Sequence, residues 1–102
     1  MMNKEQIKTK ALPILKRNGV VRAALFGSAL RGDTTRESDV DFLVEFEEGK
    51  TLLDLVGLQL ELEEQLKSKV DVITYDALHP QLRESVLKEQ EPIYEAETAV
   101  IR

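Results

Sequence analysis

The chain has 102 residues, of which 42% are hydrophobic and 32% charged, with 19 acidic residues against 14 basic ones and no cysteine. This size and composition predict a single globular domain over residues 1–102, and they exclude disulfides and thiolate metal sites. The net charge of −5 and the scattered basic residues argue against stable binding to nucleic acid, and no apolar run is long enough to span a membrane. We therefore expect a cytoplasmic protein.

The first half of the chain predicts a helix and two strands. Apolar spacing predicts a helix over residues 3–18, which ends at Gly19 because glycine takes the left-handed cap conformation easily. A strand is predicted over 20–26. Residues 27–30 are predicted to form a tight turn into a very short helix, which Gly32 closes. A second apolar strand is predicted over 39–46.

The second half continues the alternation. Apolar residues of the predicted helix 52–66 cover more than half of its circumference, whereas a stripe of about 100° is enough to pack a helix on its own core. The excess indicates either deep burial or a partner surface. A strand at 70–75, a helix near 81–89 that begins after Pro80, and a short edge strand at 92–94 complete the pattern. Short connections between alternating elements predict an α+β fold, a two-layer sandwich of helices on a small mixed sheet.

Two aspartates stand in the second predicted strand. Because strand side chains alternate, Asp39 and Asp41 share one face while Val40, Phe42 and Val44 take the other. Two such carboxylates lie about 6.5–7 Å apart and repel by roughly 2.4 kcal/mol at an effective dielectric near 20. A bound divalent cation would reverse this repulsion, and all-oxygen ligands favour Mg²⁺ or Mn²⁺. The alternative is an edge strand whose aspartates face water.

A glycine turn precedes these aspartates. Gly27 allows close backbone approach, and the Ser28 hydroxyl and helix-start N–H groups can bind phosphate oxygens. A simple turn with Ser28 as helix cap is the alternative. Arg31 and Arg36 flank the turn, either to reach triphosphate oxygens or as ordinary surface charge. A phosphate-binding turn followed after ten residues by a pair of metal-binding aspartates is a more specific signal of function than either motif alone.

The combined motif resembles that of a known superfamily. Gly27-Ser28, ten residues and then Asp39-x-Asp41 is similar to the signature of DNA polymerase beta-like nucleotidyltransferases. The longer strings at 27–32 and 38–41 resemble the minimal nucleotidyltransferase branch, and the likeness covers nearly the whole chain. It implies the polymerase beta-like palm fold. Proteins of this branch are typically antitoxins encoded beside a HEPN-domain RNase toxin, and some transfer AMP from ATP to a toxin tyrosine.

The resemblance also implies a third carboxylate on a neighbouring strand, and Asp71 matches it. Asp71 stands between Val70 and Val72 in an apolar strand, where a charge is costly without a partner. The alternative is an aspartate that faces solvent, with Asp76 and Glu45 as substitute candidates.

The implied reaction is in-line transfer of AMP from ATP to a hydroxyl group, with pyrophosphate as the leaving group and two Mg²⁺ ions held by Asp39 and Asp41. One ion would bind the outer phosphates above Gly27-Ser28. The other would activate the attacking hydroxyl, with Asp71 as its ligand and as proton acceptor. The resemblance thus implies that the chain is a Mg²⁺- and ATP-dependent protein adenylyltransferase.

Two other functions remain open: an antitoxin that neutralises its toxin by binding alone, and a nucleotidyltransferase that acts on a small molecule. The chain offers no obvious room for an acceptor domain. We therefore expect a HEPN partner to supply the acceptor hydroxyl and to cover part of helix 52–66, at Leu53 and Leu60 on one flank and Leu58 on the other. The base preference, the number of nucleotides transferred, the acceptor residue and homo- or hetero-oligomerisation stay open at this stage.

Overall fold

The computed structural model describes residues 3–26 and 40–96. Its elements follow one another in the order α1 (Lys4–Arg17), β1 (Val20–Phe26), β2 (Val40–Phe46), α3 (Leu52–Leu66), β3 (Val70–Thr74), a short 3-10 helix (Tyr75–Ala77), α4 (Pro80–Glu89) and β4 (Glu91–Glu95). Among these residues, no helix has the length and apolar character needed to cross a membrane.

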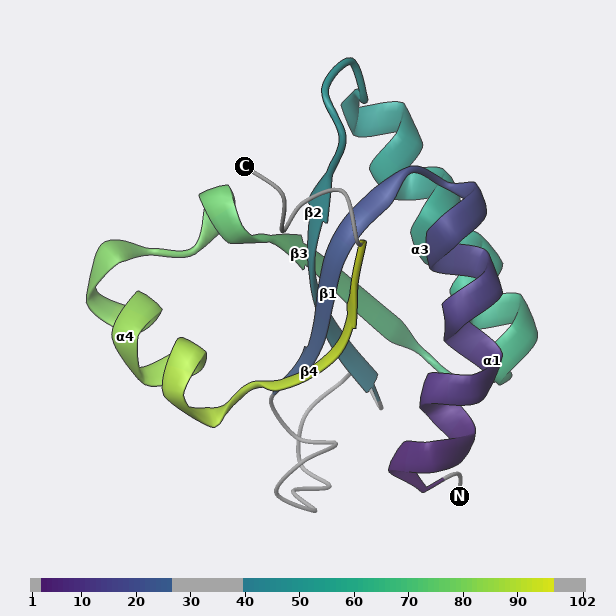
Figure 1. The fold of residues 1–102 in the computed structure, drawn as a ribbon, viewed down its shortest axis with the longest axis horizontal. Coiled ribbons are helices and arrows are strands. Elements are labelled where there is room, and N and C mark those ends of the chain that lie inside the picture. The colour runs from purple at the N-terminus through teal and green to yellow at the C-terminus, as the bar shows by residue number, and fades with distance from the viewer. Residues whose placement is uncertain (1–2, 27–39, 97–102) are drawn as a thin grey trace.

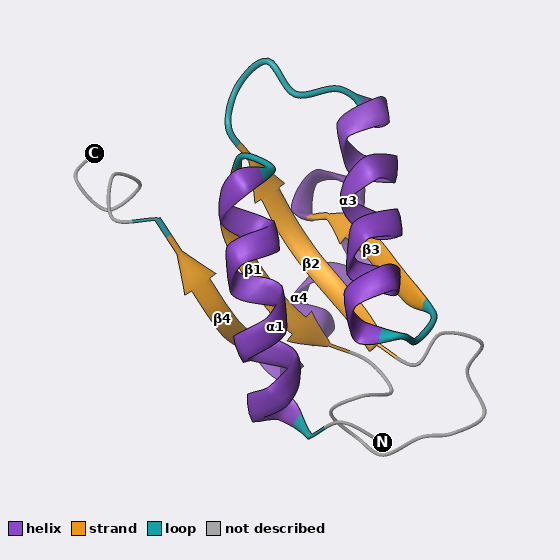
Figure 2. Ribbon diagram, turned by 90° about the vertical axis from the view of Figure 1, so that its right-hand side faces the viewer, coloured by secondary structure: helices purple, strands orange, loops and turns teal. Residues whose placement is uncertain are grey.

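The strands form one four-stranded mixed sheet in the order β3-β2-β1-β4. β2 pairs in parallel with β3 and antiparallel with β1, and β4 pairs antiparallel with the other side of β1. Helices α1 and α3 cover one face of the sheet, and α4 lies on the other side (Figures 1 and 2). The predicted α+β architecture and the predicted edge strand near residues 92–94 are therefore confirmed.

The core lies mainly between the sheet and the α1–α3 layer. Val40, Phe42 and Val44 of β2 belong to this core cluster together with residues of both helices. The opposite face carries a smaller cluster with Leu43 and Tyr75. Each strand therefore sends alternate side chains to the two faces, as the sequence pattern predicts. We refer to the side away from α1 and α3 as the α4 face.

Most predicted boundaries agree with the structure to within one residue. Gly19 ends the first helical segment with a φ of +80°, the left-handed conformation that favours glycine. A Cβ there would also lie 2.4 Å from Cε of Lys50. The third strand ends one residue earlier than predicted, because Tyr75 already begins the 3-10 helix.

Helix α3 is buried along one stripe only. Leu58 and Leu62 are fully buried and Leu66 nearly so, whereas Leu53 is 81% exposed and Leu60 is 60% exposed. Deep burial of the whole apolar arc is therefore wrong, because a helix can turn only one side toward the sheet. The expectation that Leu58 contacts a partner is also wrong, since Leu58 packs in the core.

Candidate functional site

Two aspartates lie side by side on the two parallel strands. Asp41 of β2 is the register partner of Asp71 of β3. Asp41 is completely buried and Asp71 is half-buried. Adjacent strands lie about 4.8 Å apart, and both side chains point to the α4 face by alternation. At about 5 Å and an effective dielectric near 20, two such negative charges repel by roughly 3 kcal/mol.

The register that creates this pair is fixed by the core. In β2, Val40 and Phe42 bury their side chains beneath the helices, and in β3 Val70 and Val72 do the same. A slip of one residue in either strand would move its aspartate into the helix-side core. The apolar neighbours therefore hold the two carboxylates on the α4 face, as expected from the alternation in both segments.

The glycine turn predicted from the sequence lies outside the described residues. Gly27, Ser28, Arg31 and Asp39 all belong to this group. The described part of β1 ends at Phe26, the register partner of Asp41. The residue that directly precedes Gly27 in the sequence therefore lies beside the buried aspartate. Asp41 and Asp71 are the predicted site residues that the described structure brings together.

The donor chemistry of this pair suits a hard cation. Two carboxylates on adjacent strands offer only oxygen ligands, which Mg²⁺ and Mn²⁺ prefer. Over residues 3–26 and 40–96 there is no group of three or more His, Cys, Asp or Glu side chains that could hold a metal ion. Mg²⁺ is commonly held by one or two carboxylates together with water and substrate phosphates, and Asp39 is the further carboxylate that the sequence predicts.

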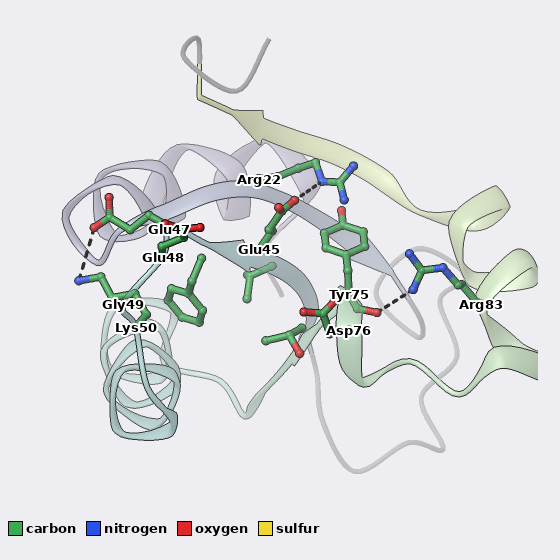
Figure 3. Close-up of a pocket in the computed structure, with 12 residues that line it drawn as sticks. Arg22, Glu45, Glu47, Glu48, Gly49, Lys50, Tyr75, Asp76 and Arg83 are labelled. Atoms are coloured by element: carbon green, nitrogen blue, oxygen red, sulfur yellow. Dashed lines mark hydrogen bonds and ion pairs between the residues drawn. The ribbon is translucent and has the colours of Figure 1, made fainter. Parts of the chain in front are cut away.

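The two substitute candidates for the third carboxylate lie elsewhere. Glu45 and Asp76 line a cavity of about 390 Å³ near the far ends of β2 and β3 (Figure 3). Glu45 stands four residues beyond Asp41 on the same strand, a separation of roughly 13 Å. Neither candidate is placed beside Asp41 as Asp71 is.

The cavity is built around Tyr75, which is 5% exposed. The Arg22 guanidinium lies 4.1 Å from the Tyr75 ring centroid, and its Nε is 3.2 Å from Oε1 of Glu45. Arg83 donates to the Tyr75 carbonyl oxygen at 2.9 Å, and the Tyr75 hydroxyl donates to Oε1 of Gln90 at 3.0 Å. Burial raises the pKa of Tyr75, although the positive charge of Arg22 opposes this rise.

Sequence reasoning did not single out the role of Arg22. The sequence does contain a signal for this role, namely an arginine within the apolar segment Val20–Phe26. A charged side chain in a central strand needs a carboxylate partner and a neighbour that packs against its aliphatic carbons. Tyr75 is a packing residue, buried in the cluster on the α4 face.

Comparison with known proteins shows which family the chain resembles. Residues 8–93 match the family model described as a nucleotidyltransferase domain. A Methanocaldococcus jannaschii protein named "Putative protein adenylyltransferase MJ0435" is 53% identical over 88 residues, which cover 86% of this chain and 95% of that protein. Protein adenylyltransferase MntA of Thermococcus cleftensis is 39% identical over 74 residues, which cover 72% of this chain and 75% of the relative.

Solved structures show the same fold. One described as a "putative minimal nucleotidyltransferase" has a TM-score of 0.75 at 44% sequence identity, and the match covers 89% of this chain and 96% of that one. Another contains the tri-AMPylated Shewanella oneidensis HEPN toxin in complex with an MNT antitoxin. It matches with a TM-score of 0.71 at 18% identity, over 93% of this chain and 75% of that chain, so its likeness concerns the fold.

Proposed function

Because this chain belongs to the nucleotidyltransferase domain family and is a nucleotidyltransferase, we propose that it transfers AMP from ATP to a hydroxyl group, most simply a tyrosine, of a partner HEPN toxin. The observation that carries the proposal is the register pair Asp41–Asp71. Two adjacent carboxylates that share one face of a sheet suit phosphoryl chemistry, in which the protein contributes positioning and charge neutralisation.

The roles of individual residues follow from their places in the chain. Asp39, Asp41 and Asp71 would hold Mg²⁺, which when bound neutralises phosphate charge and lowers the pKa of an attacking hydroxyl. Gly27 and Ser28 would bind the ATP phosphates. The half-buried Asp71 lies on edge strand β3, so an incoming acceptor can reach it more easily than the fully buried Asp41. Asp71 is accordingly the residue we assign to hold the acceptor proton.

The acceptor would come from another protein. Two relatives of this chain are named protein adenylyltransferases, one of them as putative, and a solved MNT antitoxin complex holds an AMPylated HEPN toxin. In this chain the acceptor has to approach the α4 face, because the carboxylates point to that side. The exposed leucines of α3 lie on the helix side of the sheet instead (Figure 2). One partner segment packed on α3 would therefore not also present the acceptor.

Two alternatives make different predictions. An antitoxin that acts only by binding would neutralise its toxin equally well with Asp41→Asn. A small-molecule nucleotidyltransferase would consume ATP with a small hydroxyl compound and leave the partner unlabelled. The presence of both Asp41 and Asp71 in register favours chemistry over binding alone.

The direct experiment uses ATP labelled in the α-phosphate, Mg²⁺ and the protein encoded beside this one. Mass spectrometry then maps the label. We expect an AMP adduct on a hydroxyl of the partner, absent with Asp41→Asn. A label found only on RNA or on a small molecule would overturn the proposal.

A further inference from the structure

The peptide unit that leads into β3 is held from both sides. Its carbonyl oxygen, on Lys69, accepts from the backbone N–H of Val40 at 3.2 Å. Its N–H, on Val70, donates to Oε2 of Glu63 at 3.1 Å. No peptide bond of the described residues is cis, and in a trans peptide the C=O and N–H groups point in opposite directions. The carbonyl therefore turns toward β2, and the N–H turns away from it toward α3.

Both aspartates of the site directly follow this chain of hydrogen bonds. Asp41 comes after Val40 in the sequence, and Asp71 comes after Val70. The two valines are register partners, and so are the two aspartates. The bonds that run from Glu63 through the held peptide unit to β2 therefore set the register one residue before the two carboxylates lie side by side.

The N–H of Val70 needs a partner from outside the sheet. β3 is an edge strand, so a backbone group that turns away from β2 has no further strand to bond with. Val70 is buried at 3% exposure, and a buried N–H without a partner is unfavourable. The half-buried Glu63 supplies the acceptor at the start of the strand that carries Asp71.

Glu63 is itself fixed by the last turn of α3. Its neighbour Leu62 and the residue Leu66 are buried in the core. The Glu63 carbonyl oxygen accepts from the N–H of Lys67 at 2.8 Å, and Lys67 ends the helix with a φ of +55°. Residues other than glycine rarely adopt this left-handed conformation, so the surrounding contacts have to hold it. Glu63 thus binds both ends of the turn at 67–69 that joins α3 to β3 (Figure 2).

We propose that Glu63 is a positioning residue of the transfer reaction. Its carboxylate fixes the start of β3 and thereby keeps the Asp71 carboxylate level with that of Asp41. Such a hold is needed because the two carboxylates repel each other and the edge strand β3 pairs with β2 alone. The inference rests on the proposed function, from which it takes the role of Asp71.

Two substitutions separate the hydrogen bond from the rest of the Glu63 side chain. Glu63→Met keeps the length of the side chain and a high helix propensity but removes the acceptor oxygens. Glu63→Gln keeps one acceptor oxygen. Glu64→Met is the matched control, because Glu64 is the next residue of α3 and is exposed. The control should behave as wild type in both measurements below.

The first measurement is AMP transfer to the partner protein at saturating ATP and Mg²⁺, expressed per ATP-binding site counted by calorimetry. Glu63→Met should lower this rate about 10- to 100-fold, as expected when a reacting group is displaced by about 1 Å, while ATP affinity stays close to that of wild type. Glu63→Gln should recover most of the rate. A purely structural role would instead reduce the number of ATP-binding sites and leave the rate per site unchanged, and that result would overturn the proposal.

The second measurement needs no activity. Amide hydrogen exchange of the full chain, followed by NMR without ATP or metal, reports on the bond at Val70 directly. The Val70 N–H should exchange about 10- to 100-fold faster in Glu63→Met than in wild type, as expected for the loss of a hydrogen bond to a charged group. Equal exchange rates in the two proteins would show that Glu63 does not hold β3.

Together the two measurements distinguish a failure of this inference from a failure of the proposed function. If wild type itself transfers no AMP but exchange at Val70 responds as expected, the proposed function fails, and with it the reaction that Glu63 would serve, although its hold on β3 remains. If wild type transfers AMP, Asp71→Asn does not, and Glu63→Met does so at the wild-type rate, the proposed function stands and the positioning role of Glu63 is refuted.

Discussion

Replacement of Asp71 by asparagine should stabilise the metal-free protein. Asp71 is the register partner of the fully buried Asp41, so the two carboxylates repel across about 5 Å. That repulsion is roughly 3 kcal/mol at an effective dielectric of 20, and solvent at the half-buried Asp71 screens part of it. We expect a gain of about 1–2 kcal/mol in the free energy of unfolding, with each kcal/mol worth about 4–8 °C in Tm for a domain of this size.

The assay is thermal unfolding followed by circular dichroism, first in EDTA and then with Mg²⁺. Wild type should gain stability when Mg²⁺ is added, whereas Asp71→Asn should gain less. Asp76→Asn is the control, because Asp76 is exposed and stands beyond the end of β3. A lower Tm of Asp71→Asn in EDTA would refute the reasoning, since it would show that the Asp71 carboxylate stabilises the metal-free fold.

Three further changes test other parts of the account. Ser28→Ala should weaken ATP binding by about 1.5–3 kcal/mol, measured by calorimetry, because a hydrogen bond to a charged phosphate is lost; unchanged affinity would remove Ser28 from the site. Because the pKa of Tyr75 is raised in the folded state, the protonated Tyr75 side chain contributes fully to stability below about pH 10. This contribution is lost as the pH rises toward the higher pKa of the folded state. Tyr75→Phe should therefore flatten the loss of stability above pH 10 in urea titrations, and an unchanged alkaline slope would contradict this. Leu58→Ala should lower the free energy of unfolding by about 2–5 kcal/mol, because Leu58 is fully buried, whereas Leu60→Ala should change it by no more than about 0.5 kcal/mol for the monomer. Equal changes in chemical denaturation at low protein concentration would contradict the assigned burial.

The features of the fold that could be predicted from the sequence are mostly those that depend on neighbouring residues in the chain. The Asn-Gly pair at residues 18 and 19 ends α1 because the left-handed conformation suits glycine, and apolar alternation sets the faces of β2 and β3. The pairing of β2 with β3 in parallel, with Asp41 level with Asp71, depends on contacts between distant residues. The sequence alone did not give that register, and the family resemblance pointed to Asp71 instead.

Helix α3 shows where pattern reasoning reaches its limit. Hydrophobicity alone could not tell Leu58 from Leu60, because both are leucines within a wide apolar arc. Their opposite burial depends on how α3 is rotated against the sheet, which the packing of Leu62 and Leu66 decides. The Arg22–Glu45 pair beside Tyr75 likewise depends on three separate elements meeting at one cavity.

The measurement that tests the central claim most directly is AMP transfer by Asp71→Asn under saturating ATP and Mg²⁺, with the partner protein as acceptor. ATP binding is measured in parallel, and Asp76→Asn is again the control. If Asp71 holds the acceptor proton, ATP affinity should stay close to that of wild type while the transfer rate falls by about 10²-fold or more. Transfer at the wild-type rate by a folded Asp71→Asn protein would contradict the assignment of the Asp41–Asp71 pair as the reacting site.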